Sequence, residues 1–242
     1  MAALTAPGAE GKPYEVDMRL RPTGNKGPVA TSIASFERYH GPRRDDGGGE
    51  AWTWERMALT RARPVTGPAA LRKRIAEACR TAVIIHAGQQ AIADALAMRT
   101  RMLRDLPPDG PWDVKAMPGG LVEVEFIAQA LQCAHAAKNP RILAASTRDS
   151  LSALAKAGIL PPDEAAMLIR ADRFWRTLQS LLRLTVGRWK EPALPEPAAH
   201  AILRGLAPAC EEAPVDLPSL RTQMGRVATE VRAAFEQRIG RP

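Results

Sequence analysis

Residues 14–27 place the carboxylate of Asp17 beside several cations at a spacing that suits phosphate chemistry. Apolar and charged side chains alternate over the first eight of these residues, which predicts a strand with one apolar and one charged face. Asp17 lies on the charged face beside Arg19 and Arg21, and the glycine-containing turn that follows brings Lys26 alongside. A carboxylate can hold Mg²⁺ while arginine and lysine bind phosphate oxygens, so the stretch predicts a site for a metal-bound polyphosphate. The alternative is an exposed strand face with ordinary salt bridges.

Three segments of the chain carry specific motifs. The first segment is Val16-Asp17-Met18-Arg19-Leu20-Arg21-Pro22-Thr23-Gly24. The second segment is Ala51-Trp52-Thr53-Trp54-Glu55 with Ala58-Leu59-Thr60-Arg61-Ala62-Arg63. The third segment is Trp112-Asp113-Val114-Lys115 with Gly119-Gly120-Leu121-Val122-Glu123-Val124-Glu125-Phe126. In the same order, these segments resemble motifs of the C-terminal, adenylylating half of the glutamine synthetase adenylyltransferase family, in which an aspartate stands at the position of Glu123. The resemblance is specific from residue 12 to about residue 130, and beyond that it rests on the helical pattern alone.

The resemblance implies an enzyme that transfers AMP from ATP to a tyrosine hydroxyl of glutamine synthetase and releases pyrophosphate. Asp17 would be the catalytic metal ligand for Mg²⁺, with ATP as the substrate, and Arg19, Arg21 and Lys26 would hold its phosphates. By analogy with the family, glutamine synthetase would be the target and a PII-type signal protein the regulator. A matching N-terminal half would remove AMP by phosphorolysis.

One part of the family's chemistry has no counterpart here. Nucleotidyltransferases of the polymerase-beta type hold two metal ions with three carboxylates, two of them in an Asp-x-Asp pair upstream of the strand that carries the third. Asp17 matches the third, and no such pair precedes it. Two-metal transfer needs ligands for both ions, so the chain is expected to be N-terminally truncated, to bind ATP·Mg weakly and to turn over poorly by itself.

Further candidates lie downstream of this first motif. Arg61 and Arg63 are candidates for phosphate binding, with a solvated helix end as the alternative. Gly119 and Gly120 open a helix whose first N–H groups would be free to bind an anion. The remaining cleft candidates are Lys115, Glu123 and Glu125. Because Glu123 and Glu125 are two residues apart on a helix, at most one is expected to face the cleft, while the other pairs with an arginine.

Composition narrows the class of protein. The chain of 242 residues has a formal net charge of +8, which attracts polyanions such as nucleotides or acidic proteins, although a solvated basic surface explains it as well. No apolar run approaches the roughly 20 residues that span a bilayer, so no membrane association is expected. Three widely spaced cysteines suggest neither disulfides nor zinc, which favours the cytoplasm. Nothing resembles an RNA-binding motif, so nucleic acid is not an expected partner.

The predicted fold is mainly α. Residues 1–66 would be the C-terminal remnant of a polymerase-beta-type nucleotidyltransferase α/β domain, and residues 67–242 an α-helical bundle. Helical periodicity predicts helices over about 50–63, from 69 with an interruption at Gly88 to 105, and over 121–137, 146–158, 162–187, 198–206 and 217–239. Trp52 and Trp54 are predicted to be core or domain-interface residues.

Two functions therefore compete. In the first, the chain is part of the AMP-transferring enzyme. In the second, it is a non-catalytic helical docking module for glutamine synthetase or a PII-type regulator, a possibility favoured by the missing Asp-x-Asp pair. An RNA nucleotidyltransferase would share the metal site, but it would transfer AMP to RNA.

Overall fold

The structure, a computed structural model, describes residue 6 and residues 20–42, 49–187 and 189–242. Its α-helices are α2 (Ile33–His40), α3 (Thr53–Leu59), α4 (Ala69–Ile85), α5 (Gln90–Asp105), α6 (Leu121–His135), α7 (Thr147–Lys156), α8 (Pro162–Thr185), α9 (Glu196–Leu206) and α10 (Leu217–Arg238). Short 3-10 turns are η1 (Gly24–Lys26), η2 (Pro140–Ile142) and η3 (Ala207–Ala209). These residues contain no strand, and the prediction of a mainly α protein is confirmed.

The predicted strand near the N-terminus lies outside the described residues except for its last two positions. Leu20 and Arg21 belong to bends, and the side chain of Leu20 is exposed. The prediction that this region is the remnant of an α/β nucleotidyltransferase domain therefore stays a prediction.

Local signals in the sequence account for most helix ends. The Ser32 side chain accepts a hydrogen bond from the Ser35 amide at 3.1 Å and caps the start of α2. Ser146 caps α7 in the same way, through the amide of Asp149. The helix α8 begins at Pro162, whose fixed backbone angle suits a first helical turn.

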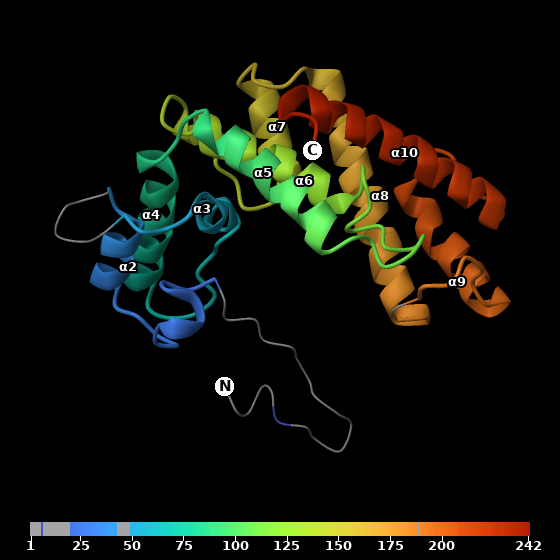
Figure 1. The fold of residues 1–242 in the computed structure, drawn as a ribbon, viewed down its shortest axis with the longest axis horizontal. Coiled ribbons are helices and arrows are strands. Elements are labelled where there is room, and N and C mark those ends of the chain that lie inside the picture. Colours follow the sequence, from blue (N-terminus) through green and yellow to red (C-terminus); the bar gives the residue numbers. More distant parts are fainter. Residues whose placement is uncertain (1–5, 7–19, 43–48, 188) are drawn as a thin grey trace.

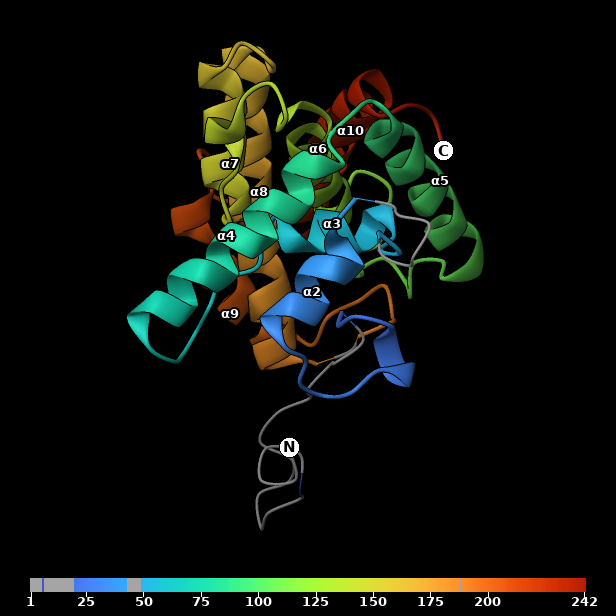
Figure 2. The same ribbon diagram turned by 90° about the vertical axis from the view of Figure 1, so that its left-hand side faces the viewer.

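The helix α6 lies at the centre of the molecule, in contact with α3, α5, α7, α8 and α10 (Figure 1). Nearly its whole circumference is buried, which agrees with its continuously apolar sequence. The helices α8 and α10 pack against α6, α9 packs against α8 and α10, and α2, α3 and α4 gather at the other end of the molecule. Seen from that end, α2 and α4 lie in front of the bundle, with α3 close to α6 (Figure 2).

The short helix α3 contacts the helical bundle directly. Met57 on α3 is only 1 % exposed and belongs to the same hydrophobic cluster as Val124 of α6 and Trp175 of α8. Thr53, at the start of α3, donates a hydrogen bond from its hydroxyl to Asp94 on α5. The domain boundary predicted between residues 66 and 67 stays a prediction. Met57, before this boundary, packs against apolar residues of the bundle that follow it.

The helix α3 is shorter than expected. It was predicted over residues 50–63 but spans Thr53–Leu59, and the hydroxyl of the buried Thr60 donates a hydrogen bond to the Met57 carbonyl where the helix ends. Trp52 and Trp54 were expected to be core or domain-interface residues; they are 69 % and 40 % exposed, so they are not in the core, and the domain-interface alternative stays a prediction. Apolar contact from this helix to the bundle is instead made by Met57.

Candidate functional site

The residues proposed to bind nucleotide fall partly outside the described region. Asp17 and Arg19 both lie there. Arg21 begins a turn, in which its carbonyl accepts a hydrogen bond from the Gly24 amide at 2.8 Å. Gly24 has a positive φ angle of 56°, as a glycine in a turn permits, and Thr23 beside it also has a positive φ angle, of 60°. Lys26 ends η1 and is exposed, and its position beside Asp17 stays a prediction.

Arg61 and Arg63 follow α3 in a turn on the surface. The Arg61 side chain is 42 % exposed and its Nη1 lies 3.0 Å from Oε1 of Glu125 on α6. Arg63 is exposed, and no hydrogen bond or ion pair joins its side chain to another of the described residues. The structure therefore brings the second and third sequence motifs together through the pair of Arg61 and Glu125.

Glu125 is shared between two arginines. Its Oε1 accepts a hydrogen bond from Nη2 of Arg176 on α8 at 2.7 Å, in addition to the one from Arg61. Arg176 also donates from Nε to Asp172 at 2.8 Å, and Arg148 on α7 lies 3.4 Å from the same carboxylate. Burial raises the pKa of Asp172, while the neighbouring arginines act in the opposite direction.

Sequence reasoning missed this network. Arg176 was not among the candidate residues, although its guanidinium contacts both Glu125 and Asp172. One signal was present in the sequence, since Asp172 and Arg176 are four residues apart and can pair on one helix face. The contact with Glu125 depends on how α8 packs against α6.

Glu123 has a structural position. Its side chain is 0 % exposed, and Oε1 lies 2.9 Å from Nε of Arg99 and 2.8 Å from Nη1 of Arg232. Its other oxygen accepts the Gly119 amide at 2.9 Å. Arg99 is itself buried and donates further hydrogen bonds to the backbone carbonyls of Ala116 and Met117. At most one of Glu123 and Glu125 was expected to face a cleft while the other paired with an arginine. Both carboxylates pair with arginines, and a cleft position for either stays a prediction.

The start of α6 does not offer free N–H groups to an anion. The amides of Leu121 and Val122 donate to the carbonyls of Val114 and Lys115 at 3.0 and 3.1 Å. The expectation of an anion site made by these amides is therefore wrong. The physical reason is that the preceding loop folds back over the helix start and supplies the missing acceptors. Lys115 itself presents an exposed side chain.

Gly119 and Gly120 are needed for close packing. Gly119 has φ +72°, and a Cβ atom on it would lie 1.9 Å from the carbonyl oxygen of Ala228 on α10. Its own carbonyl accepts a hydrogen bond from the buried indole of Trp175 at 3.1 Å. A Cβ atom on Gly120 would lie 2.6 Å from the Val114 carbonyl oxygen. Both glycines let the backbone approach its neighbours closely, as glycines at an anion site also would.

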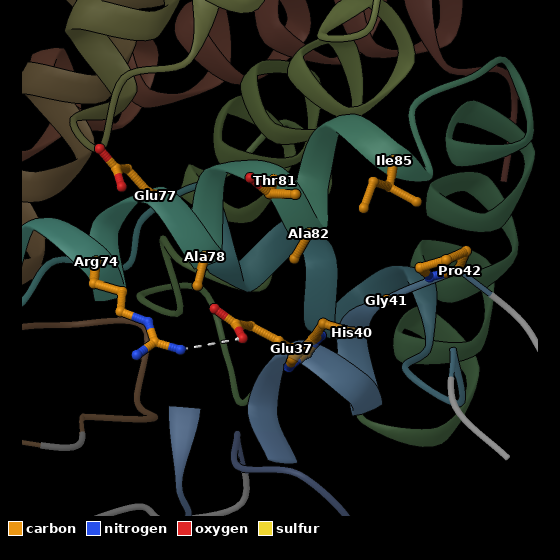
Figure 3. Close-up of a pocket in the computed structure, with 10 residues that line it drawn as sticks. All are labelled: Glu37, His40, Gly41, Pro42, Arg74, Glu77, Ala78, Thr81, Ala82 and Ile85. Atoms are coloured by element: carbon orange, nitrogen blue, oxygen red, sulfur yellow. Dashed lines mark ion pairs between the residues drawn. The ribbon is translucent and has the colours of Figure 1, made fainter. Parts of the chain in front are cut away.

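A cavity of about 560 Å³ lies between α2 and α4 (Figure 3). Arg74 on α4 and Glu37 on α2 form an ion pair of 3.6 Å at its edge. His40 lines it too, and burial together with the nearby Arg56 lowers the pKa of His40 to about 4. His86, at the end of α4, contacts the Gly41 carbonyl through Nε2 at 2.7 Å.

No group of three or more histidine, cysteine, aspartate or glutamate side chains gathers in a metal-binding arrangement among the described residues. The same part of the chain has no helix that is both long and apolar enough to cross a bilayer. The proposed metal ligand, Asp17, lies outside it.

Comparison with known proteins gives two matching family models. Residues 1–78 match a model described as glutamate-ammonia ligase adenylyltransferase. Residues 89–239 match a model described as GlnD PII-uridylyltransferase. Together the two models take in most of the chain and meet in the region of α4 and α5.

Curated relatives extend the similarity over nearly the whole chain. A protein of Rhodopseudomonas palustris (strain BisB5) is 38 % identical over 99 % of this chain, and proteins of Bradyrhizobium diazoefficiens and Caulobacter vibrioides are each 40 % identical over 97 % of it. Each is named a bifunctional glutamine synthetase adenylyltransferase/adenylyl-removing enzyme. The chain covers 23 %, 22 % and 23 % of these relatives respectively, which is just under a quarter of their length.

Proposed function

Since the chain belongs to the glutamine synthetase adenylyltransferase family, we propose that it takes part in transferring AMP from ATP to a tyrosine hydroxyl of glutamine synthetase. The tyrosine oxygen forms a bond to the α-phosphorus, and pyrophosphate leaves. The observation that supports this proposal is the direct contact between two of the family's motifs. Arg61 of the second motif pairs with Glu125 of the third at 3.0 Å, and α3 packs on α6.

We assign the nucleotide site to the first motif and the turn after α3. Arg19, Arg21 and Lys26 bind phosphates, and Arg61 and Arg63 extend the row of cations. Arginine forks suit phosphate oxygens because two N–H groups can bind them side by side. The exposure of Arg61 and Arg63 supports this assignment, since both can be reached from solvent.

Asp17 is the proposed metal ligand. Mg²⁺ is commonly held by one or two carboxylates together with substrate phosphates and water, so the donor chemistry of Asp17 fits this ion. When bound, the ion would neutralise charge that develops on the phosphates during transfer. Because only one such carboxylate is identified in the sequence, we expect the isolated chain to bind ATP·Mg weakly and to transfer AMP slowly.

Transfer of radiolabelled AMP from ATP to purified glutamine synthetase tests the proposal. We expect slow labelling that Asp17→Asn abolishes. Glu15→Gln is the matched control, because Glu15 lies two residues earlier on the same expected strand face and has no assigned ligand. Loss of labelling with both variants, or with neither, would contradict the role of Asp17.

A docking module is the second candidate. It is favoured by one observation: Glu123 and the glycine-led start of α6 are committed to internal contacts, so this part of the bundle offers no reacting group. In that case the chain would bind glutamine synthetase or a PII-type signal protein without transferring AMP. Partner binding measured by calorimetry, with no labelling by wild-type chain, would support the module. We place either activity in the cytoplasm, which suits the three free cysteines.

The DNA upstream of the Met1 codon gives an independent test. An in-frame Gly-Ser turn followed by an Asp-x-Asp pair would supply the two further carboxylates that two-metal transfer needs. The enzyme proposal expects that pair to be encoded there, and its absence in all reading frames would favour the docking module.

A further inference from the structure

Five charged side chains form a network where the turn after α3 meets the bundle. They are Arg61, Arg148 and Arg176 with Glu125 and Asp172. Three positive charges face two negative charges, so one positive charge is in excess. A site with surplus arginine charge at a surface attracts anions.

Arg61 and Arg176 hold Glu125 unequally. Arg176 is fixed at several points, because it donates to Asp172, to Glu125 and, at 3.2 Å, to the Thr147 hydroxyl. Arg61 makes a single contact of 3.0 Å from a side chain that is 42 % exposed. Arg61 is therefore the partner that can leave.

We propose that Arg61 exchanges between Glu125 and a phosphate group, and that Glu125 is the positioning residue that holds Arg61 until phosphate arrives. The inference rests on the proposed function, because it assigns the phosphate to the polyphosphate chain of the nucleotide. It adds that the third motif acts on nucleotide binding through Arg61 and touches no reacting atom.

The energetics allow the exchange. The side chain of Glu125 is only 13 % exposed, and a buried carboxylate that lost all its partners would be strongly destabilised. Arg176 remains in place at 2.7 Å, so the departure of Arg61 leaves no unpaired buried charge. Half-exposed ion pairs are weak, whereas an arginine that binds phosphate can make two parallel charge-assisted hydrogen bonds.

The exchange couples phosphate binding to the packing of the chain. While it is paired with Glu125, Arg61 connects the turn at residues 60–63 to α6. When Arg61 binds phosphate instead, that contact is lost. By thermodynamic reciprocity, anything that strengthens the pair with Glu125 therefore weakens phosphate binding. A variant without the Glu125 charge should therefore bind polyphosphate more tightly.

Calorimetric titration of the 242-residue chain with inorganic tripolyphosphate at low salt tests this inference. We expect Glu125→Gln to bind about fivefold more tightly than wild type, because it no longer competes for Arg61. Arg61→Met should weaken binding by a similar factor and should remove the gain from Glu125→Gln in the double variant. Glu125→Asp, which keeps the charge for Arg176 but is one methylene shorter, should also bind more tightly.

Glu164→Gln is the matched control. Glu164 is 14 % exposed and paired with Arg238, so the substitution changes the net charge by the same amount. It lies 12 residues before Arg176 on α8, roughly 18 Å away along the helix. An equal gain with Glu164→Gln would reduce the effect to net charge and overturn the inference.

The other possible results of these titrations also test the inference. Unchanged or weaker binding by Glu125→Gln, or unchanged binding by Arg61→Met, overturns the exchange. The latter substitution is at an exposed position, where folding is not at stake. Tighter polyphosphate binding without any AMP transfer would support the exchange while removing the proposed function, so the two can fail separately.

Discussion

Arg99 and Glu123 meet inside the helical bundle with 2.9 Å between Nε and Oε1, and their side chains are only 1 % and 0 % exposed. A second arginine, Arg232 of α10, reaches the same oxygen at 2.8 Å. One carboxylate thus joins α5, α6 and α10. A pair so deeply buried is maintained only while each charge keeps its partner.

Neutralising Glu123 should strongly destabilise the protein. In Glu123→Gln the buried guanidinium of Arg99 would lose its carboxylate partner, while Arg232 would keep its pair with Glu236, and we expect a loss of about 3–5 kcal/mol in the free energy of unfolding. Urea denaturation followed by circular dichroism measures it. Glu37→Gln, which removes the half-exposed pair with Arg74, is the control and should cost less than about 1 kcal/mol. Similar losses for the two variants would contradict a structural role for Glu123.

Gly119 should not tolerate a side chain. In Gly119→Ala the new methyl group would collide with the Ala228 carbonyl oxygen, and the backbone would be held at a positive φ that alanine disfavours. We expect a lowered thermal unfolding temperature. Gly225→Ala is the control, because Gly225 lies within α10 and a Cβ atom on it meets nothing within 4 Å. That variant should gain about 0.5–1 kcal/mol from helix propensity, and a stable Gly119→Ala would show that α10 can shift.

The stability of the protein should fall as the pH is lowered through the range where His40 titrates. Its folded pKa of about 4 is below the ordinary value of 6.5, because of burial, Arg56 and His86. Between these values the unfolded chain binds the extra proton, so stability present at pH 7 is lost on acidification. The full contribution is on the order of 3 kcal/mol. His40→Gln should flatten this part of the stability curve, and an unchanged slope in that variant would exclude His40 as the cause.

The three cysteines should react with thiol reagents in a fixed order. Burial raises the pKa of Cys133 to about 12 and also raises the pKa of Cys79, and both side chains are buried. Cys210 is only partly buried and should react first at pH 8, with Cys133 last. Mass spectrometry after a timed exposure to iodoacetamide reads the order. Early modification of Cys133 in the folded chain would mean that α6 opens readily.

The sequence by itself determined the mainly α fold, most helix ends and the family. Those features rest on local signals: the caps at Ser32 and Ser146, the proline that begins α8, and the spacing of apolar residues along each helix. Gly24, two residues before Lys26, likewise predicted the positive φ angle found there. Such signals act over a few residues, so they can be read without knowing the tertiary structure.

Only the tertiary structure decided what Glu123, Glu125 and the start of α6 do. Their partners lie far away in sequence, with Glu123 paired to Arg232 and Glu125 to Arg61 and Arg176. Spacing along one helix cannot predict such contacts, because they depend on how α3, α8 and α10 pack around α6. The same packing places the carbonyls of Val114 and Lys115 against the amides of Leu121 and Val122, which were expected to be free.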